Sequence, residues 1–223
     1  MTVRPYYEQD GITIYHGDCN DVLPTLPCVD LVLTDPPYGI QYVSKWRLDK
    51  DRYHAVKHNK IYGDYALPIE QIQKSIRKAT SGTYVFCRWD NLSTMPPPRS
   101  VLVWVKNDWS AGDLKHSHGR QWEAICFYPG PKHEFTTRIP DVIHANRTDN
   151  VYHPTEKPEE LFQALMLANV GQTILDPFMG SGTTLVAAKR LGRIAIGIER
   201  EEHYCEVAVK RLQQGALNFS GES

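Results

Sequence analysis

Short apolar runs alternate along the chain with stretches in which apolar residues recur at helical spacing. The short runs have the length and composition of strands, and helical stretches separate several of them. Strands are expected at residues 12–16, 30–34, 83–87, 101–105, 123–128, 173–175 and 193–198. Helices are expected at residues 69–79, 158–168, 185–191 and 204–212. The alternation predicts an α/β fold, with a mostly parallel sheet covered by helices.

The run at 30–34 is the clearest strand. It shows little alternation of apolar and polar residues, which indicates a strand buried on both faces. It stops at Asp35-Pro36-Pro37. Two consecutive prolines remove two backbone donors, so the sheet hydrogen bonds must end there.

A glycine loop follows the strand at 173–175. The run Asp176-Pro177-Phe178-Met179-Gly180-Ser181-Gly182-Thr183-Thr184 leads into a helix, and the next strand ends at Glu199. Glycines let a ligand approach the backbone closely, and amides at a helix N-terminus can hold an anionic group. A carboxylate at Glu199 could accept hydrogen bonds from ribose hydroxyls. The pattern predicts a nucleoside-binding unit; taken alone, the loop could equally be a tight strand-to-helix turn.

The run from Asp176 to Thr184 resembles the S-adenosyl-L-methionine (AdoMet) motif of DNA amino-methyltransferases. The segment His153-Pro154-Thr155-Glu156-Lys157-Pro158 resembles the one that precedes this motif in the same family. The resemblance implies AdoMet as cofactor and places Thr155 and Lys157 near its carboxylate; the alternative for this segment is a helix-capping turn. The cofactor-binding residues expected are Asp18, Cys19, Asp35, Thr155, Lys157, Asp176, Phe178, Gly180, Ser181, Gly182, Thr183, Glu199 and Arg200.

The run Asp35-Pro36-Pro37-Tyr38 resembles the catalytic motif of that family, and the chemistry explains its residue types. An exocyclic amino nitrogen is a poor nucleophile, because its lone pair is delocalised into the base. Acceptors for both N–H groups, the Asp35 carboxylate and the Pro36 carbonyl, would favour a tetrahedral nitrogen facing the methyl group. Pro37 makes the backbone rigid, and Tyr38 offers a ring to stack on a flipped base.

The order of the motifs adds to the resemblance. The catalytic motif precedes the AdoMet motif, as in the circularly permuted β group of the family. A Rossmann-like AdoMet-dependent methyltransferase fold with a seven-stranded sheet is therefore expected, with the order broken between the strand ending at Glu199 and the strand ending at Asp18. The chain would then begin and end at adjacent points. In the family, an acid at the end of this strand contacts the adenine amino group of AdoMet, which implies this role for Asp18, with the Cys19 amide near the ring. Asp18 could equally cap the short helix after it.

The composition of the chain limits how a nucleic acid could bind to it. The 223 residues suit one domain, and a formal net charge of −1 requires any nucleic acid to bind through a local basic patch. Residues 41–60 carry six Lys or Arg against two Asp, although a solvated loop would look similar. Segments 41–65 and 107–150 are candidate target-recognition insertions in a single domain, 1–223. The expected substrate-binding residues are Lys45, Trp46, Arg47, Arg52 and Tyr53.

These features predict an enzyme that methylates adenine N6 in double-stranded DNA, because the family's cytosine-N4 enzymes more often have Ser in place of Asp35. The alternatives are a cytosine-N4 enzyme and a catalytically idle DNA- or AdoMet-binding regulator. The short recognition region implies loose sequence specificity or a homodimer. Five scattered cysteines and no long apolar run predict a cytoplasmic protein, in a bacterium or a phage-infected cell, with no metal and no membrane span.

Overall fold

The computed structural model describes residues 3–39, 66–110, 115–116, 118–148 and 156–217. Its strands form one nine-stranded sheet in the order β1-β2-β9-β8-β3-β4-β6-β5-β7. The strands are β1 (Tyr7–Gln9), β2 (Ile12–His16), β3 (Val29–Thr34), β4 (Ala79–Cys87), β5 (Ser100–Ser110), β6 (Arg120–Pro129), β7 (Val142–His144), β8 (Thr173–Asp176) and β9 (Ile194–Glu199). The helices are α1 (Cys19–Val22), α2 (Ile69–Lys78), α3 (Glu159–Leu167), α4 (Thr183–Arg190) and α5 (Glu202–Leu217), with 3₁₀ turns η1 (Leu23–Thr25) and η2 (Trp89–Asn91).

The centre of the sheet is parallel. Strands β2, β9, β8, β3 and β4 all run in one direction, whereas β6 is antiparallel to both β4 and β5. The expected α/β class and mostly parallel sheet are confirmed. The strand number expected was too low, because the three-residue edge strands β1 and β7 are too short for an alternating pattern to show.

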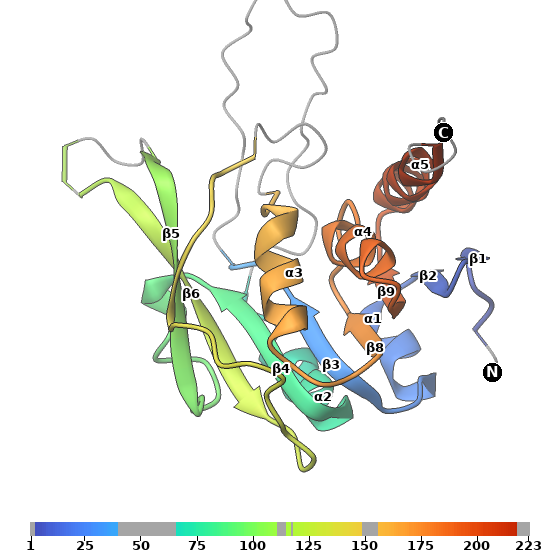
Figure 1. Ribbon diagram of the computed structural model, residues 1–223, viewed down its shortest axis with the longest axis horizontal. Coiled ribbons are helices and arrows are strands. Elements are labelled where there is room, and N and C mark those ends of the chain that lie inside the picture. The colour runs from blue at the N-terminus through green and yellow to red at the C-terminus, as the bar shows by residue number, and fades with distance from the viewer. Residues whose placement is uncertain (1–2, 40–65, 111–114, 117, 149–155, 218–223) are drawn as a thin grey trace, which may run out of the picture.

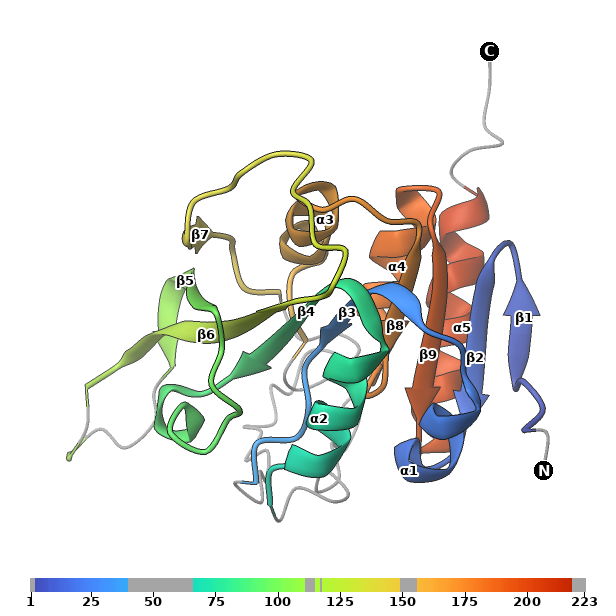
Figure 2. The ribbon, with the colours of Figure 1, turned by 90° about the horizontal axis from the view of Figure 1, so that it is seen from below.

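Helices cover both faces of the sheet. In Figures 1 and 2, α3, α4 and α5 lie on one face, and α1 and α2 lie on the other. Along β3, Leu31 and Leu33 join the core under α3 to α5, while Val32 points into the core under α1; all three are completely buried. Burial on both faces explains why this strand reads as an apolar run.

The helices change face in the middle of the sheet. The connection from β2 to β3 passes through α1 on one face, and the connection from β8 to β9 passes through α4 on the other. The carboxyl ends of these four strands therefore meet at one edge, where the chain turns away in opposite directions. Open α/β sheets commonly bind ligands at such a point.

The permuted order is visible in the strand pairing. Strand β2 pairs directly with β9, with His16 opposite Glu199, so the sheet is continuous and only the chain connection is broken there. Strand β1 and helix α5 lie at the same side of the molecule (Figure 1). Residues 107–150 include β6 and β7, which belong to the sheet, so a recognition role there concerns only the segments around these strands. No described helix is long and apolar enough to cross a membrane.

Candidate active site

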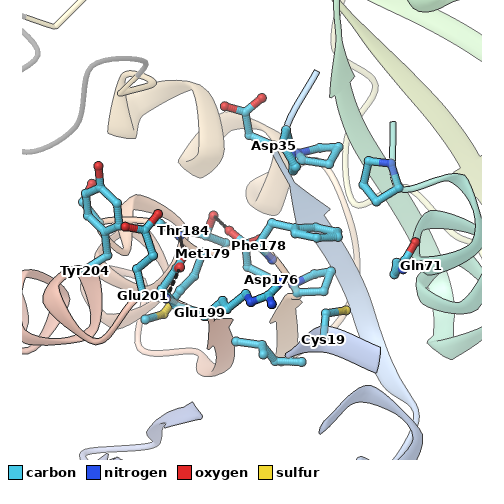
Figure 3. Close-up of a pocket in the computed structure, with 18 of the residues that line it drawn as sticks. Cys19, Asp35, Gln71, Asp176, Phe178, Met179, Thr184, Glu199, Glu201 and Tyr204 are labelled. Atoms are coloured by element: carbon cyan, nitrogen blue, oxygen red, sulfur yellow. Dashed lines mark hydrogen bonds between the residues drawn. The ribbon is translucent and has the colours of Figure 1, made fainter. Parts of the chain in front are cut away.

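A cavity of about 300 Å³ opens at the carboxyl ends of β2, β3, β8 and β9 (Figure 3). It contains both motifs singled out in the sequence, which are more than a hundred residues apart along the chain. The expected site residues that line it are Asp18, Cys19, Asp35, Pro36, Pro37, Tyr38, Lys157, Asp176, Phe178, Gly180, Ser181, Thr183, Glu199 and Arg200. Five expected DNA-contacting residues (Lys45, Trp46, Arg47, Arg52 and Tyr53) and Thr155 lie outside the described residues.

Gly182 does not line this cavity. It precedes the first residue of α4 with a φ of 82°, and a Cβ atom added to it would lie 2.7 Å from the Ala208 Cβ on α5. The glycine therefore permits a left-handed turn and a close approach between two helices. Its expected place among the cofactor-binding residues stays a prediction.

The catalytic motif forms a rigid bend after β3. The Tyr38 hydroxyl donates to Asp35 Oδ1 at 2.5 Å, and the Lys157 ammonium donates to Asp35 Oδ2 at 2.5 Å. The side chain of Asn91 on η2 fixes the backbone by donating to the Tyr38 carbonyl. Burial raises the pKa of Asp35, although the Lys157 charge opposes the rise. The carboxylate is thus held on both oxygens beside the cavity.

Lys157 contacts Asp35 in this structure. Its ammonium also lies 3.3 Å from Glu123 Oε2, and its side chain is only 5% exposed. Burial favours loss of its proton, but the two carboxylates outweigh burial and raise the pKa of Lys157. Tyr38 places its ring face 5.5 Å from the same ammonium, which adds a cation–π contact.

Glu123, on β6, is a residue of the site that the sequence interpretation missed. Its other oxygen accepts a 2.5 Å ion pair from Lys106 on β5. Burial alone would raise the pKa of Glu123, but the Lys157 and Lys106 ammonium groups lower it to about 2. The signal in the sequence was an acid at the amino end of an apolar strand. Because β6 runs antiparallel to β4, its amino end lies at the edge where β4 ends.

Asp176 ties three elements together at the start of the glycine loop. Its two oxygens accept hydrogen bonds from Thr34 on β3 at 2.8 Å and from Thr184 on α4 at 2.5 Å. The backbone amide of Phe178 donates to it as well. Burial raises the pKa of Asp176 to about 6, and these hydrogen bonds oppose the rise. The position of the loop depends on this carboxyl group.

Glu199 closes the other side of the loop. Its oxygens accept the amides of Gly180 at 3.0 Å and Glu201 at 2.8 Å. Burial raises the pKa of Glu199 to about 7. The carboxyl group therefore stands beside the cavity and titrates near neutral pH.

Asp18 caps the short helix α1. One oxygen accepts the Asn20 amide at 2.8 Å, and the other lies 3.4 Å from the Arg200 guanidinium. The helix-capping alternative is therefore present, and it does not prevent the side chain from lining the cavity. Burial raises the pKa of the neighbouring Cys19 thiol to about 12, so this cysteine stays protonated.

Arg211, on α5, is a second residue that the sequence interpretation missed. Its guanidinium donates to the Ser181 carbonyl, to Ser181 Oγ and to Thr183 Oγ1, all at 3.0 to 3.1 Å. It also forms a 2.9 Å ion pair with Glu156, which is 5% exposed. One arginine thus joins α5 to the glycine loop and to the turn before α3. No spacing in the sequence pointed to it, because the contact depends on how α5 packs.

Comparison with known proteins shows which family has this sequence. A family model for DNA methylases of the N6/N4 class matches residues 99–210, which is half of the chain. The type II methyltransferase M.HinfI of Haemophilus influenzae is 30% identical over 249 residues, covering 91% of this chain and 68% of the relative. The chain belongs to the N6/N4 DNA methylase family.

Further relatives agree with the methylase family. The type II methyltransferase M2.LlaDCHI of Lactococcus lactis subsp. cremoris is 26% identical over 263 residues, covering 97% of this chain and 94% of the relative. A crystal structure of an M1.HpyAVI–SAM complex has the same fold, with a TM-score of 0.66 at 24% identity; the match covers 90% of this chain and 100% of that one. The expected fold, the resemblance to DNA amino-methyltransferases and the AdoMet dependence are confirmed.

The residues of the methylase cavity fit AdoMet. Phe178, Met179 and Ile198 supply an apolar lining next to the acids Asp18 and Glu199, a combination that suits an adenosine. Asp35 lies on the β3 side of the same cavity (Figure 3). The cavity can therefore accommodate a nucleoside and leaves its reactive group near the catalytic motif.

Proposed function

We propose that this methylase transfers the AdoMet methyl group to the N6 amino group of adenine in double-stranded DNA. The observation that carries the proposal is Asp35, a carboxylate held by Tyr38 and Lys157 at the edge of the cavity. The chain's membership in the N6/N4 class supports the reaction type. The choice of adenine rests on Asp35, since related cytosine-N4 enzymes more often have Ser at this position.

The protein's part in the reaction is to prepare the amino group. A carboxylate oxygen can accept two hydrogen bonds, so Asp35 can accept an N–H of the base while it keeps Tyr38 and Lys157. The Pro36 carbonyl would accept the second N–H, held by the rigid Pro36-Pro37 backbone. AdoMet supplies an electrophilic methyl group on its sulfonium. The nitrogen that receives the methyl group becomes cationic, and Asp35, whose pKa burial raises, can take the proton it loses.

The same proposal assigns roles to the remaining residues of the cavity. Glu199 accepts hydrogen bonds from the ribose hydroxyls, and Asp18 with the Cys19 amide contacts the adenine ring of AdoMet. Gly180, Ser181 and Thr183 form the backbone cradle that Asp176 positions beside Phe178. Lys157, and Thr155 outside the described residues, serve the AdoMet carboxylate. Arg200 pairs with Asp18 at the rim of the cavity.

Recognition of DNA is proposed for the basic and aromatic segment that follows the catalytic motif. Lys45, Arg47 and Arg52 would contact phosphates, and Trp46 and Tyr53 would stack on bases. The formal net charge of −1 supports a local patch over a general attraction to DNA. The chain would act in the cytoplasm, as a monomer or a homodimer.

Methyl transfer from labelled AdoMet to duplex DNA tests the proposal. Wild-type protein should transfer label, and digestion of the product should yield N6-methyladenine. Asp35→Ala should lower the rate at least a hundredfold, because the amino group loses its acceptor. Sequencing of DNA from an expressing host, by a method sensitive to modified bases, reports the recognised site.

The outcomes separate the alternatives. N4-methylcytosine in the product would make the enzyme cytosine-specific. Binding of DNA and AdoMet without any transfer of label would show a regulator instead of an enzyme. Asp35→Asn is the matched variant, because it keeps the size of the side chain and removes the charge.

A further inference from the structure

Four charged side chains of alternating sign form a row beneath the catalytic motif. Asp35 pairs with Lys157 at 2.5 Å, Lys157 lies 3.3 Å from Glu123, and Glu123 pairs with Lys106 at 2.5 Å. None of the four side chains is more than 20% exposed. Burying such a row costs desolvation free energy unless every charge is paired, so a row of this kind next to the catalytic motif points to a function.

Glu123 contacts both of the groups that donate hydrogen bonds to Asp35. One of its oxygens lies 3.3 Å from the Lys157 ammonium and 3.3 Å from the Tyr38 hydroxyl. Those two groups donate to the two oxygens of Asp35. Glu123 and Lys106 are not among the residues that line the cavity, whereas Asp35, Lys157 and Tyr38 are. Glu123 therefore acts on Asp35 through its neighbours and does not touch a ligand in the cavity.

The charges around Asp35 come from several elements. Lys157 precedes α3, Glu123 is on β6, Asp176 ends β8, and the Tyr38 hydroxyl and the Cys87 thiol also face this region. After burial, the charges that most affect the pKa of Asp35 are Lys157, which lowers it, and Glu123, which raises it. Without Glu123, the full charge of the Lys157 ammonium would act on the Asp35 carboxylate. It would lower the pKa of Asp35 and weaken Asp35 as a hydrogen-bond acceptor.

We infer that Glu123, backed by Lys106, is a positioning residue for methyl transfer: it holds Lys157 and Tyr38 in place and shares the Lys157 charge, so that Asp35 stays a strong acceptor for the target amine. The inference rests on the proposed function. It accounts for the buried row, because without Glu123 the whole charge of Lys157 would act on Asp35.

Removing the charge of Glu123 in one variant and of Lys106 in another tests the inference, because the two changes should move the pKa of Asp35 in opposite directions. In Glu123→Gln the pKa of Asp35 should fall, and the acid limb of the pH–kcat profile should move down by about one pH unit. In Lys106→Met the charge of Glu123 is less neutralised, and the limb should move up. In Glu123→Gln kcat should also fall about tenfold.

A second readout does not depend on activity. Carbon NMR of labelled aspartates follows the Asp35 carboxyl, assigned by its loss in Asp35→Asn, and its titration should shift in the same two directions. Glu159→Gln is the matched control: Glu159 is 19% exposed against 18% for Glu123, and it is ion-paired with Arg190, outside the cavity. That control should change neither the acid limb nor the titration.

Opposite shifts in the two variants support the inference, and Glu123→Asp, which keeps the charge, should restore the wild-type limb. Should Glu123→Gln fail to fold, Lys106→Met and Glu123→Asp still give the comparison. An Asp35 titration that matches wild type in every folded variant overturns the inference, even if kcat has fallen. A wild type that transfers no methyl group counts against the proposed function alone, since the NMR titration still reports on Glu123.

Discussion

At the scale of single residues, the site is built from carboxyl groups whose surroundings set their proton affinity. Asp176 and Glu199 frame the glycine loop, and burial raises the pKa of both, to about 6 and about 7. Glu123 has the opposite shift, because two ammonium groups contact it. Neighbouring acids of one type can therefore be protonated or ionised at neutral pH according to their partners.

Glu199 should release a proton when AdoMet binds. Ribose hydroxyls that donate to it favour the ionised form, so binding should lower a pKa that burial had raised to about 7. Because the free protein is about half protonated there at pH 7, about half a proton should be released, and affinity should rise as the pH increases from 6 to 8. Calorimetry in buffers of different ionisation enthalpy measures this release.

The same experiment has a direct control. Glu199→Gln should abolish the proton release, and Glu202→Gln, an exposed carboxyl group on α5, should leave it unchanged. Release that persists in Glu199→Gln would mean that another group titrates on binding and that Glu199 does not receive the ribose.

At the scale of elements, the sequence indicated most of the sheet. The apolar runs located β2, β3, β8 and β9 within one or two residues, since burial on both faces leaves a continuous pattern. The hairpin of β1 and β2 was missed, although Asp10-Gly11 is a turn signal and both residues have positive φ. Glu123 and Arg211 were missed for a different reason: their partners come from strand pairing and helix packing, which no local pattern encodes.

The contact between α4 and α5 should be sensitive to a single methyl group. Gly182→Ala adds a Cβ atom 2.7 Å from Ala208 Cβ, on a backbone with a φ of 82°. The positive φ should cost about 1–2 kcal/mol and the clash about 1–3 kcal/mol more. Urea unfolding of the variant measures the sum.

Gly192 provides the comparison for that measurement. It has a φ of 64°, but nothing lies within 4 Å of its added Cβ atom. Gly192→Ala should therefore lose only the cost of the positive φ, about 1–2 kcal/mol. Equal losses at the two glycines would show that the helix contact does not restrict residue 182.

At the scale of the whole molecule, charge is nearly balanced, so binding to DNA should depend on where cations lie. If the segment 41–60 contacts phosphates, replacing Lys45, Arg47 and Arg52 by Ala should reduce the slope of log K against log salt by about 2 to 3, since each phosphate contact contributes about 0.9. Fluorescence anisotropy with a labelled duplex over a range of salt concentrations measures the slope.

A control for that slope lies at the end of α4 that points away from the cavity. Lys189 and Arg190 end α4, whose first turn adjoins the cavity, so they are at the end of the helix farthest from it. Replacing both by Ala should leave the slope unchanged. If it changes as much as in the triple variant, the protein binds DNA through its general charge and not through the 41–60 segment.

Arg211 has a consequence for how this protein tolerates variation. The Arg211 guanidinium on α5 donates hydrogen bonds to the backbone and the hydroxyl groups of the glycine loop. The ordering of that loop and the docking of α5 onto the sheet are therefore energetically coupled. A substitution anywhere along α5 that loosens its docking is therefore also a change in cofactor affinity. In a mutational survey, substitutions on α5 that lie far from the catalytic motif would therefore abolish methylation although the protein still folds.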